Sequence, residues 1–261
     1  MNYPPAKAGW GWLKQGFVIF RKHPGQLTML FTSYMFVMIG IGFIPVLGQL
    51  LPMFLAPTFS MVFMVACAQY EQQGQLNPLQ LRATFVSPVS RRLFILGGIY
   101  LLAALLAVAI SFLLDGGIFT QLMAGNREIA ATPEQRTSVL LTLTVLAAVF
   151  IPVFWYVPPL IVWQKMSIGK AIFYSFFSVI RSFKSFLVYG LSWLVVGAIL
   201  PTLFGGLLAL VVGQSFAMLL MLLLTIVLTV VMYCSFYPTY VAIFGPPELP
   251  QDPPQLYTNR G

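Results

Sequence analysis

The side chains with the clearest chemical use in this sequence are basic residues repeated at a fixed spacing near its start. Lys7, Lys14 and Arg21 lie seven residues apart, and Lys22 follows Arg21. Side chains seven positions apart share one face of a helix. Cations held in a row beside apolar side chains can bind the anionic headgroups of phospholipids. We therefore predict that these four residues contact headgroups.

A second stretch, "SIGKAIFYSFFSVIRSFK" (167–184), repeats this pattern. On a helix its apolar side chains form one face, which comprises Ile172, Phe173, Phe176, Val179, Ile180 and Phe183. The stretch also carries Lys170, Arg181 and Lys184, which we predict to contact headgroups as well.

Other reactive groups give no sign of catalysis. Cys67 and Cys234 each lie inside an apolar segment, so we interpret them as small hydrophobic residues rather than a disulfide or a redox pair. His23 is the only histidine, which excludes a histidine-rich metal site. The sequence has no glycine-rich phosphate loop followed by lysine and no cysteine or histidine cluster. We predict that the protein is not an enzyme and has no catalytic residues, cofactor or metal.

The elements that must position these groups are membrane-spanning helices. Of the 261 residues, 59% are hydrophobic and 8% are charged, whereas a soluble domain has about 45–50% apolar and about 25% charged residues. A helix needs about 20 apolar residues to cross a bilayer. Six segments qualify, at about 24–44, 48–69, 93–114, 138–163, 186–211 and 216–243. We predict an all-α polytopic membrane protein in which residues 1–244 form a single six-span domain.

The basic residues also predict how the chain is oriented. With six spans, twelve of the fourteen lysine and arginine residues fall on the side of the two termini, and only Arg127 and Arg136 fall on the other side. Because short cytoplasmic loops are enriched in Lys and Arg, both termini are predicted to be cytoplasmic. Insertion topology and attraction to anionic lipids explain the net charge of +8, so we predict no nucleic-acid partner.

Residues 7–23 are predicted to form an amphipathic helix in the plane of the membrane, on its cytoplasmic surface. We assign Trp10, Leu13, Phe17 and Phe20 to the face opposite the basic row. Pro24 then breaks the helix and lets the chain turn into the membrane. Residues 167–184 form a second such helix, and 77–92 a weaker one with an Asn77 cap and Pro78 at the first position.

Three units of in-plane helix and hairpin suggest an internal repeat. Prolines recur in the even-numbered spans, and we predict helix kinks at Pro57, Pro158 and Pro238. The carbonyls that these prolines free need partners, and nearby hydroxyls such as Ser60 and Ser235 are candidates. Three kinked spans could surround a binding cavity or a pore, but the sequence favours bent helices that fill an ordinary bundle core.

The two longest polar segments have separate signatures. Thr132, Pro133 and Gln135 in the outer loop (115–138) form a capping box that begins the fourth helix. That helix is too long for one crossing if it continues to Lys165, so it should rise above the outer surface or bend at Pro152. Residues 245–261 are rich in proline and are predicted to be a disordered cytoplasmic tail.

The segment "GWGWLKQGFVIFRKHP" (9–24) and the span after it resemble a family of uncharacterised proteobacterial inner-membrane proteins, classed as a domain of unknown function. This resemblance covers most of the chain and implies a multi-pass protein of the bacterial inner membrane. The plan of in-plane helices between apolar hairpins also looks loosely like the membrane region of some glycerophosphodiester phosphodiesterases, although the chain has no room for their catalytic barrel.

Three functions follow from these features as hypotheses. The first is handling of a lipid or another amphiphile, with the bilayer and its anionic lipids as partners. The second is a scaffold or assembly factor that binds membrane proteins, or its own copies, through glycines at 39–42, 97–98 and 205–206. The third and weakest is a pore for an uncharged solute, lined by Thr142, Thr144, Thr225 and Thr229. We favour the first.

Overall fold

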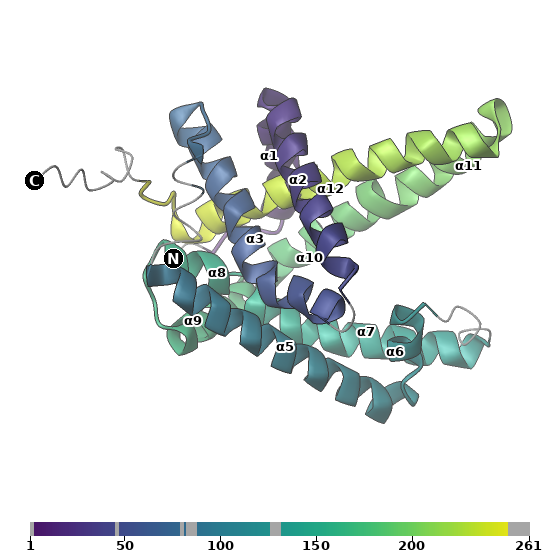
Figure 1. The fold of residues 1–261 in the computed structure, drawn as a ribbon, viewed down its shortest axis with the longest axis horizontal. Helices are drawn as coiled ribbons and strands as arrows, with labels where there is room; N and C mark the ends of the chain where they lie inside the picture. The colour runs from purple at the N-terminus through teal and green to yellow at the C-terminus, as the bar shows by residue number, and fades with distance from the viewer. Residues whose placement is uncertain (1–2, 45–46, 79–80, 82–87, 126–131, 250–261) are drawn as a thin grey trace, which may run out of the picture.

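The computed structural model describes residues 3–44, 47–78, 81, 88–125 and 132–249 (Figure 1). Within these ranges every regular element is helical. Six helices are long and apolar enough to cross a membrane: Pro24–Gly42, Leu50–Gln73, Ser90–Asp115, Pro133–Val162, Phe183–Val212 and Gln214–Phe244. The predicted all-α polytopic fold is therefore confirmed, and the predicted spans agree with these helices to within a few residues at most ends.

The six spans form three hairpins that diverge from a common end (Figure 1). The first hairpin consists of α2 (Pro24–Gly42) and α3 (Leu47–Gln73). The second consists of α5 (Pro88–Asp115) and α7 (Pro133–Phe154), with the short α6 (Ile118–Met123) between them. The third consists of α10 (Phe183–Leu194), a π-helical turn (Val195–Ile199), α11 (Leu200–Val212) and α12 (Gln214–Phe244).

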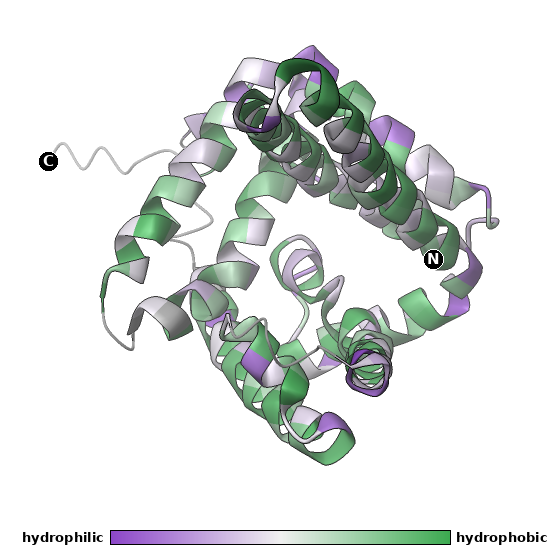
Figure 2. Ribbon diagram, turned by 90° about the vertical axis from the view of Figure 1, so that its right-hand side faces the viewer, coloured by the Kyte–Doolittle hydropathy of each residue, from purple (hydrophilic) through white to green (hydrophobic). Residues whose placement is uncertain are grey.

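Two ends of the molecule can be distinguished. We call the connections near Gly42, Gly116 and Gly213 the tips; those of the second and third hairpins lie toward the right of Figure 1. We call the opposite end, where both termini lie, the base. The base also contains α1 (Ala8–Lys22), α8 (Val157–Val162) and α9 (Ile168–Arg181). Hydrophobic residues predominate along the long helices (Figure 2), as membrane spans require.

The packed core lies at the base. All ten residues from 61 to 70 of α3 are buried. One face of this segment packs against α8 and α12 through Met64, Ile161 and Tyr240, and another packs against α1, α2 and α12 through Phe63. By contrast, the tip half of the α11–α12 hairpin is exposed, with Leu210 at 85%. The two large buried clusters therefore lie in one half of the bundle.

The N-terminal helix begins and ends as predicted but packs differently. It ends at Lys22, and Pro24 begins α2. Its buried side consists of Gly9, Trp12, Leu13, Gly16 and Ile19, which face α10 and α12. Trp10 is exposed, and the Lys14 ammonium lies 5.5 Å from its ring centre. The assignment of Trp10 to the face opposite the lysines is wrong, because Trp10 borders the basic row and the opposite face is packed on protein.

The fourth span bends, as its length predicts. Thr132 and Gln135 form the predicted capping box at its start. The helix is interrupted at Trp155 and Tyr156, three residues after the predicted bend at Pro152, and α8 continues the span.

Two predictions concern segments that the structure describes only in part. The beginning of the C-terminal tail is packed rather than free, because Pro247 is buried and its carbonyl accepts a hydrogen bond from Gln72 Nε2 at 3.0 Å. Disorder of 250–261 concerns residues outside the described ranges, as does half of the predicted in-plane helix at 77–92, namely 79–80 and 82–87. The internal repeat stays a prediction.

Candidate functional site

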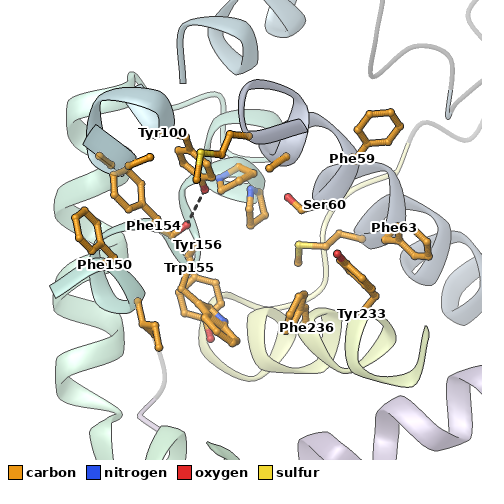
Figure 3. Close-up of a pocket in the computed structure, with 18 of the residues that line it drawn as sticks. Phe59, Ser60, Phe63, Tyr100, Phe150, Phe154, Trp155, Tyr156, Tyr233 and Phe236 are labelled. Carbon is orange, nitrogen blue, oxygen red and sulfur yellow. Dashed lines mark hydrogen bonds between the residues drawn. The ribbon is translucent and has the colours of Figure 1, made fainter. Parts of the chain in front are cut away.

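A cavity of about 470 Å³ lies between the second, third, fourth and sixth spans (Figure 3). The sequence favours a filled core, and the structure differs because the helices separate above the packed base. Half of the residues that line it are aromatic, among them Phe59 and Phe63 of α3, Phe150 and Phe154 of α7, and Phe236 of α12. Its volume falls within the range of about 300–1,000 Å³ that is typical of small-molecule sites.

Small side chains make room for this cavity on the α5 side. Ala103, Ala104 and Ala107 lie on one face of α5 and line the cavity. Gly97, one turn and a half earlier, lies so close to α3 that an added Cβ would clash with the Phe54 carbonyl. The glycine therefore holds α5 against α3, and the alanines above it leave the space open.

The bend that shapes the cavity arises from an inserted hydroxyl group. In a regular helix the Tyr156 N–H would donate to the Pro152 carbonyl. Instead, the Tyr156 N–H donates to Ser175 Oγ at 3.0 Å, and the Ser175 hydroxyl donates to the Pro152 carbonyl at 2.9 Å. A side chain inserted in this way opens a helix. Ser175 of α9 is fully buried and thus fixes the break between α7 and α8.

Proline completes this break. Pro158 has no N–H to donate to the carbonyl of Phe154, four residues earlier. The Tyr100 hydroxyl of α5 donates to that carbonyl at 3.4 Å, across the cavity wall (Figure 3, dashed line). Pro158 therefore contributes to a kink as predicted, and the freed carbonyl accepts a hydrogen bond from a tyrosine in the other span of the same hairpin.

The other two predicted kink prolines lie within continuous helices. Pro57 is inside α3 and Pro238 is inside α12, and both are buried. The hydroxyl of Ser60 donates to the Pro57 carbonyl at 3.0 Å, and that of Ser235 donates to the Met232 carbonyl at 2.7 Å. Each bond runs to the carbonyl three residues before the serine. The carbonyls that Pro57 and Pro238 free are those four residues before each proline, so these bonds do not occupy them.

The cavity wall is uncharged. Among the described residues that line it, none is charged, and the polar atoms are hydroxyl groups and one indole N–H. The indole N–H of Trp155 donates to Thr239 Oγ1 at 3.4 Å, and the buried Tyr156 hydroxyl donates to the Thr239 carbonyl at 3.1 Å. Because the Trp155 and Tyr156 groups already have partners within the protein, the wall offers mainly apolar surface to a ligand.

All seven predicted headgroup residues are exposed and belong to the base. Two of them also make a polar contact with another side chain. Lys22 pairs with Glu71 of α3 at 2.9 Å, and an Arg181 guanidinium nitrogen donates to the Tyr3 hydroxyl at 2.6 Å. None of the seven lines the cavity, so the structure separates the basic surface from the apolar site.

The helix α9 combines a packed face and an open aromatic face. Its buried residues are small, namely Ala171, Ser175, Ser178 and Val179. Of the predicted apolar face, Phe173, Phe176, Ile180 and Phe183 are exposed by 38–58%. Because the small residues pack on α7 and α8, the rings remain available for lipid.

The cysteines, threonines and glycines named in the sequence lie away from the cavity wall. Cys67 and Cys234 are free, buried and part of one cluster, in keeping with small hydrophobic residues. None of the four threonines proposed for a pore lines the cavity, and Thr144, Thr225 and Thr229 bond to carbonyls of their own helices. A Cβ added at Gly40, Gly98 or Gly206 would meet nothing within 4 Å, so these glycines face outward.

Sequence reasoning missed the residues that create the cavity. Ser175 bonds to Tyr156, which lies 19 positions earlier in the chain, and no local sequence pattern predicts such a contact. Tyr100 is one aromatic residue in an apolar span. The alanine face of α5, with three alanines at i, i+1 and i+4, was the one signal available.

Comparison with known proteins gives one informative relative. The chain is 34% identical, over 248 residues, to a probable inner membrane protein of Burkholderia thailandensis, and the match covers 92% of each chain. No family model matches the sequence, and no solved structure matches it. These comparisons lend no support to the likeness with glycerophosphodiester phosphodiesterases.

Proposed function

Since this chain belongs to the same family as the probable inner membrane protein of Burkholderia thailandensis and is a multi-pass inner membrane protein, we propose that it binds the apolar part of a lipid or another amphiphile. The binding site is the aromatic cavity between α3, α5, α7 and α12. The role is binding rather than catalysis. The uncharged wall of this cavity is the observation that carries the proposal.

The chemistry of the wall favours a hydrocarbon over water as the occupant. A buried water needs two to four polar partners, and the hydroxyls of Ser60 and Tyr100 and the Trp155 indole already bond within the protein. An empty cavity leaves its lining atoms without dispersion contacts. Since the surrounding solvent is lipid, a hydrocarbon chain is the nearest group that restores these contacts.

Packing, rather than the hydrophobic effect, supplies the affinity. Lipid tails are as apolar as leucine, so transfer from the bilayer into an apolar cavity gains little free energy by itself. The rings of Phe63, Tyr156 and Phe236 are held by the packed base before any ligand binds. A chain that meets this preformed surface gains contacts without ordering the protein.

The exposed cations of the base fit a separate role at the membrane surface. Lys14 and Arg21 of α1, Arg181 at the end of α9 and Lys184 just after it would contact anionic headgroups on the cytoplasmic side, where the positive-inside rule also predicts both termini. Neutralising all four should lower the share of anionic lipid that copurifies. An unchanged lipid composition would remove this part of the proposal.

Native mass spectrometry of protein extracted in a mild detergent tests the cavity. We expect wild-type protein to retain lipid at a fixed stoichiometry. Ala104→Phe fills the space beside α7, and loss of about 1.4 kcal/mol of contact would weaken retention about tenfold. Ala109→Phe places the same ring on the exposed side of α5 and should retain lipid as the wild type does. Equal retention by all three proteins would show that the retained lipid lies outside the cavity.

A further inference from the structure

We infer that the cavity takes one acyl chain of a phospholipid whose headgroup stays in the leaflet at the tips of the hairpins. This inference rests on the proposed function, because it specifies the ligand and the direction from which the ligand enters the same cavity. The basic residues of the base assign the tip leaflet to the periplasmic side.

The exposure of the lining residues gives the direction of the opening. On α3, Met53 near the tip is 46% exposed, whereas Phe63 and Met64 near the base are 2% and 4% exposed. On the fourth span, Ile151 is 42% exposed and Tyr156, closer to the base, is 1% exposed. The cavity is therefore closed at the base and open toward the tips.

The floor of the cavity is held shut by several independent contacts. Tyr156 hydrogen-bonds to the Thr239 carbonyl, and its ring packs edge-on against Phe244 of α12 with centres 5.2 Å apart. Below it, the buried cluster of Met64, Leu160 and Ile161 fills the space between α3 and α8. A chain that started from the base leaflet would have to separate these groups.

The depth of the cavity matches a single acyl chain. Its lining on α3 runs from Met53 to Met64, which is about 17 Å at about 1.5 Å per residue. One leaflet of the hydrocarbon core is about half of 30 Å thick. A chain that follows α3 from the tip leaflet would reach the aromatic floor with its end.

The polar residues at the tips favour recognition of the lipid's acyl chain over recognition of a charged headgroup. Asp115 is buried, and its carboxylate accepts hydrogen bonds from the Ser111 hydroxyl and the Gly117 N–H, both at 2.9 Å. In the described part of the outer loop the remaining charges are Glu134 and Arg136, one of each sign. The base, in contrast, carries the row of cations.

Photolabelling from one leaflet at a time tests the inference. The probe is a lysophosphatidylethanolamine with a diazirine near the end of its single chain, added to only one side of proteoliposomes. A Glu134→Cys variant, labelled with a membrane-impermeant maleimide, reports the orientation of each preparation, since Cys67 and Cys234 are buried. Labelled peptides are then mapped by mass spectrometry.

We expect probe on the tip side to label residues 59–64 and 100–107 several-fold more than probe on the base side. Ala104→Phe should abolish this labelling, and Ala109→Phe should preserve it. Equal or stronger labelling from the base side would overturn the inferred direction and leave cavity binding intact. Labelling of outward-facing residues alone, from both sides, would overturn the proposed function together with the inference.

Discussion

The base and the tips of this bundle are built from the same helices but differ in how those helices meet. At the base, α3 buries ten consecutive residues between two clusters, and hydroxyl and tyrosine side chains bridge neighbouring helices. Toward the tips, the hairpins diverge and expose leucines such as Leu207 and Leu210 by 65% and 85%. The cavity lies where the packed half gives way to the open half.

The difference shows what holds helices together in lipid. Transfer of a leucine side chain from lipid into protein gains little free energy, so a leucine-rich hairpin is not driven to pack against the other hairpins by the hydrophobic effect. Small residues allow close approach, and polar side chains supply hydrogen bonds. The base has both, as in the contact of Gly16 with Ser235 and the 2.6 Å hydrogen bond between Tyr189 and Ser235.

The largest expected effect comes from closing the gap between α1 and α12. A Cβ added at Gly16 would lie 2.6 Å from the Cβ and 2.9 Å from the Cα of Ser235. Because backbone cannot move aside as a side chain can, Gly16→Ala should lower the free energy of unfolding by about 3 kcal/mol. Gly11→Ala, with open space in the same helix, should leave stability unchanged or raise it by about 0.5–1 kcal/mol. Denaturant unfolding in detergent measures both, and equal losses would refute close packing of α1.

Truncating one apolar residue in each half compares the halves directly. Ile161 is fully buried at the base, and Leu210 is 85% exposed at a tip. Ile161→Ala leaves a cavity and should cost about 2 kcal/mol, less than in a water-soluble core because the transfer term is small in lipid. Leu210→Ala should change the unfolding free energy by less than about 0.5 kcal/mol. Similar costs at both positions would mean that the tips are packed as well.

Removing the inserted hydroxyl should have a smaller effect on stability. Ser175→Ala leaves the Tyr156 N–H and the Pro152 carbonyl without their shared partner, which should cost about 1–2 kcal/mol. Ser192→Ala is the control, because its hydroxyl bonds only to the Val188 carbonyl of its own helix. Retained lipid should also fall in Ser175→Ala, since the bend shapes the cavity. Unchanged stability and retention would show that proline alone makes the bend.

The smallest effect is expected at the ion pair on the surface of the base. Lys22 and Glu71 are exposed by 51% and 36%, so water screens their 2.9 Å contact. Lys22→Gln should lower the unfolding free energy by less than about 1 kcal/mol, and high salt should remove the difference. A larger, salt-resistant loss would indicate a role for Lys22 beyond this pair.

Much of the fold could be predicted because it depends on local signals. Apolar length defines the spans, Pro24 ends α1, and Thr132 with Gln135 caps α7. The buried face of α1 could not be predicted in the same way. By hydrophobicity alone, Trp10 is a better candidate for the buried face than Gly16. In lipid, however, the glycine is the residue that packs, because its lack of a side chain lets α12 approach.

The candidate site was predictable only in outline. Of the three predicted kink prolines, Pro158 contributes to a break, whereas Pro57 and Pro238 lie within continuous helices. Whether bent helices enclose space depends on side chains distant in sequence, such as Ser175 and Tyr100. Their effect follows from three-dimensional contacts, so one sequence alone leaves a filled core and a cavity as alternatives.

Fluorescence of Trp155 gives the most direct test of a hydrocarbon-filled cavity, because its ring lines the wall. The signal is the difference between wild-type protein and Trp155→Phe, reconstituted in bilayers, which removes the contribution of the other tryptophans. If an acyl chain occupies the cavity, lipids brominated near the chain end should quench this signal and aqueous iodide should not. Quenching by iodide, with no effect of brominated chains, would show that water fills the cavity and would contradict lipid binding.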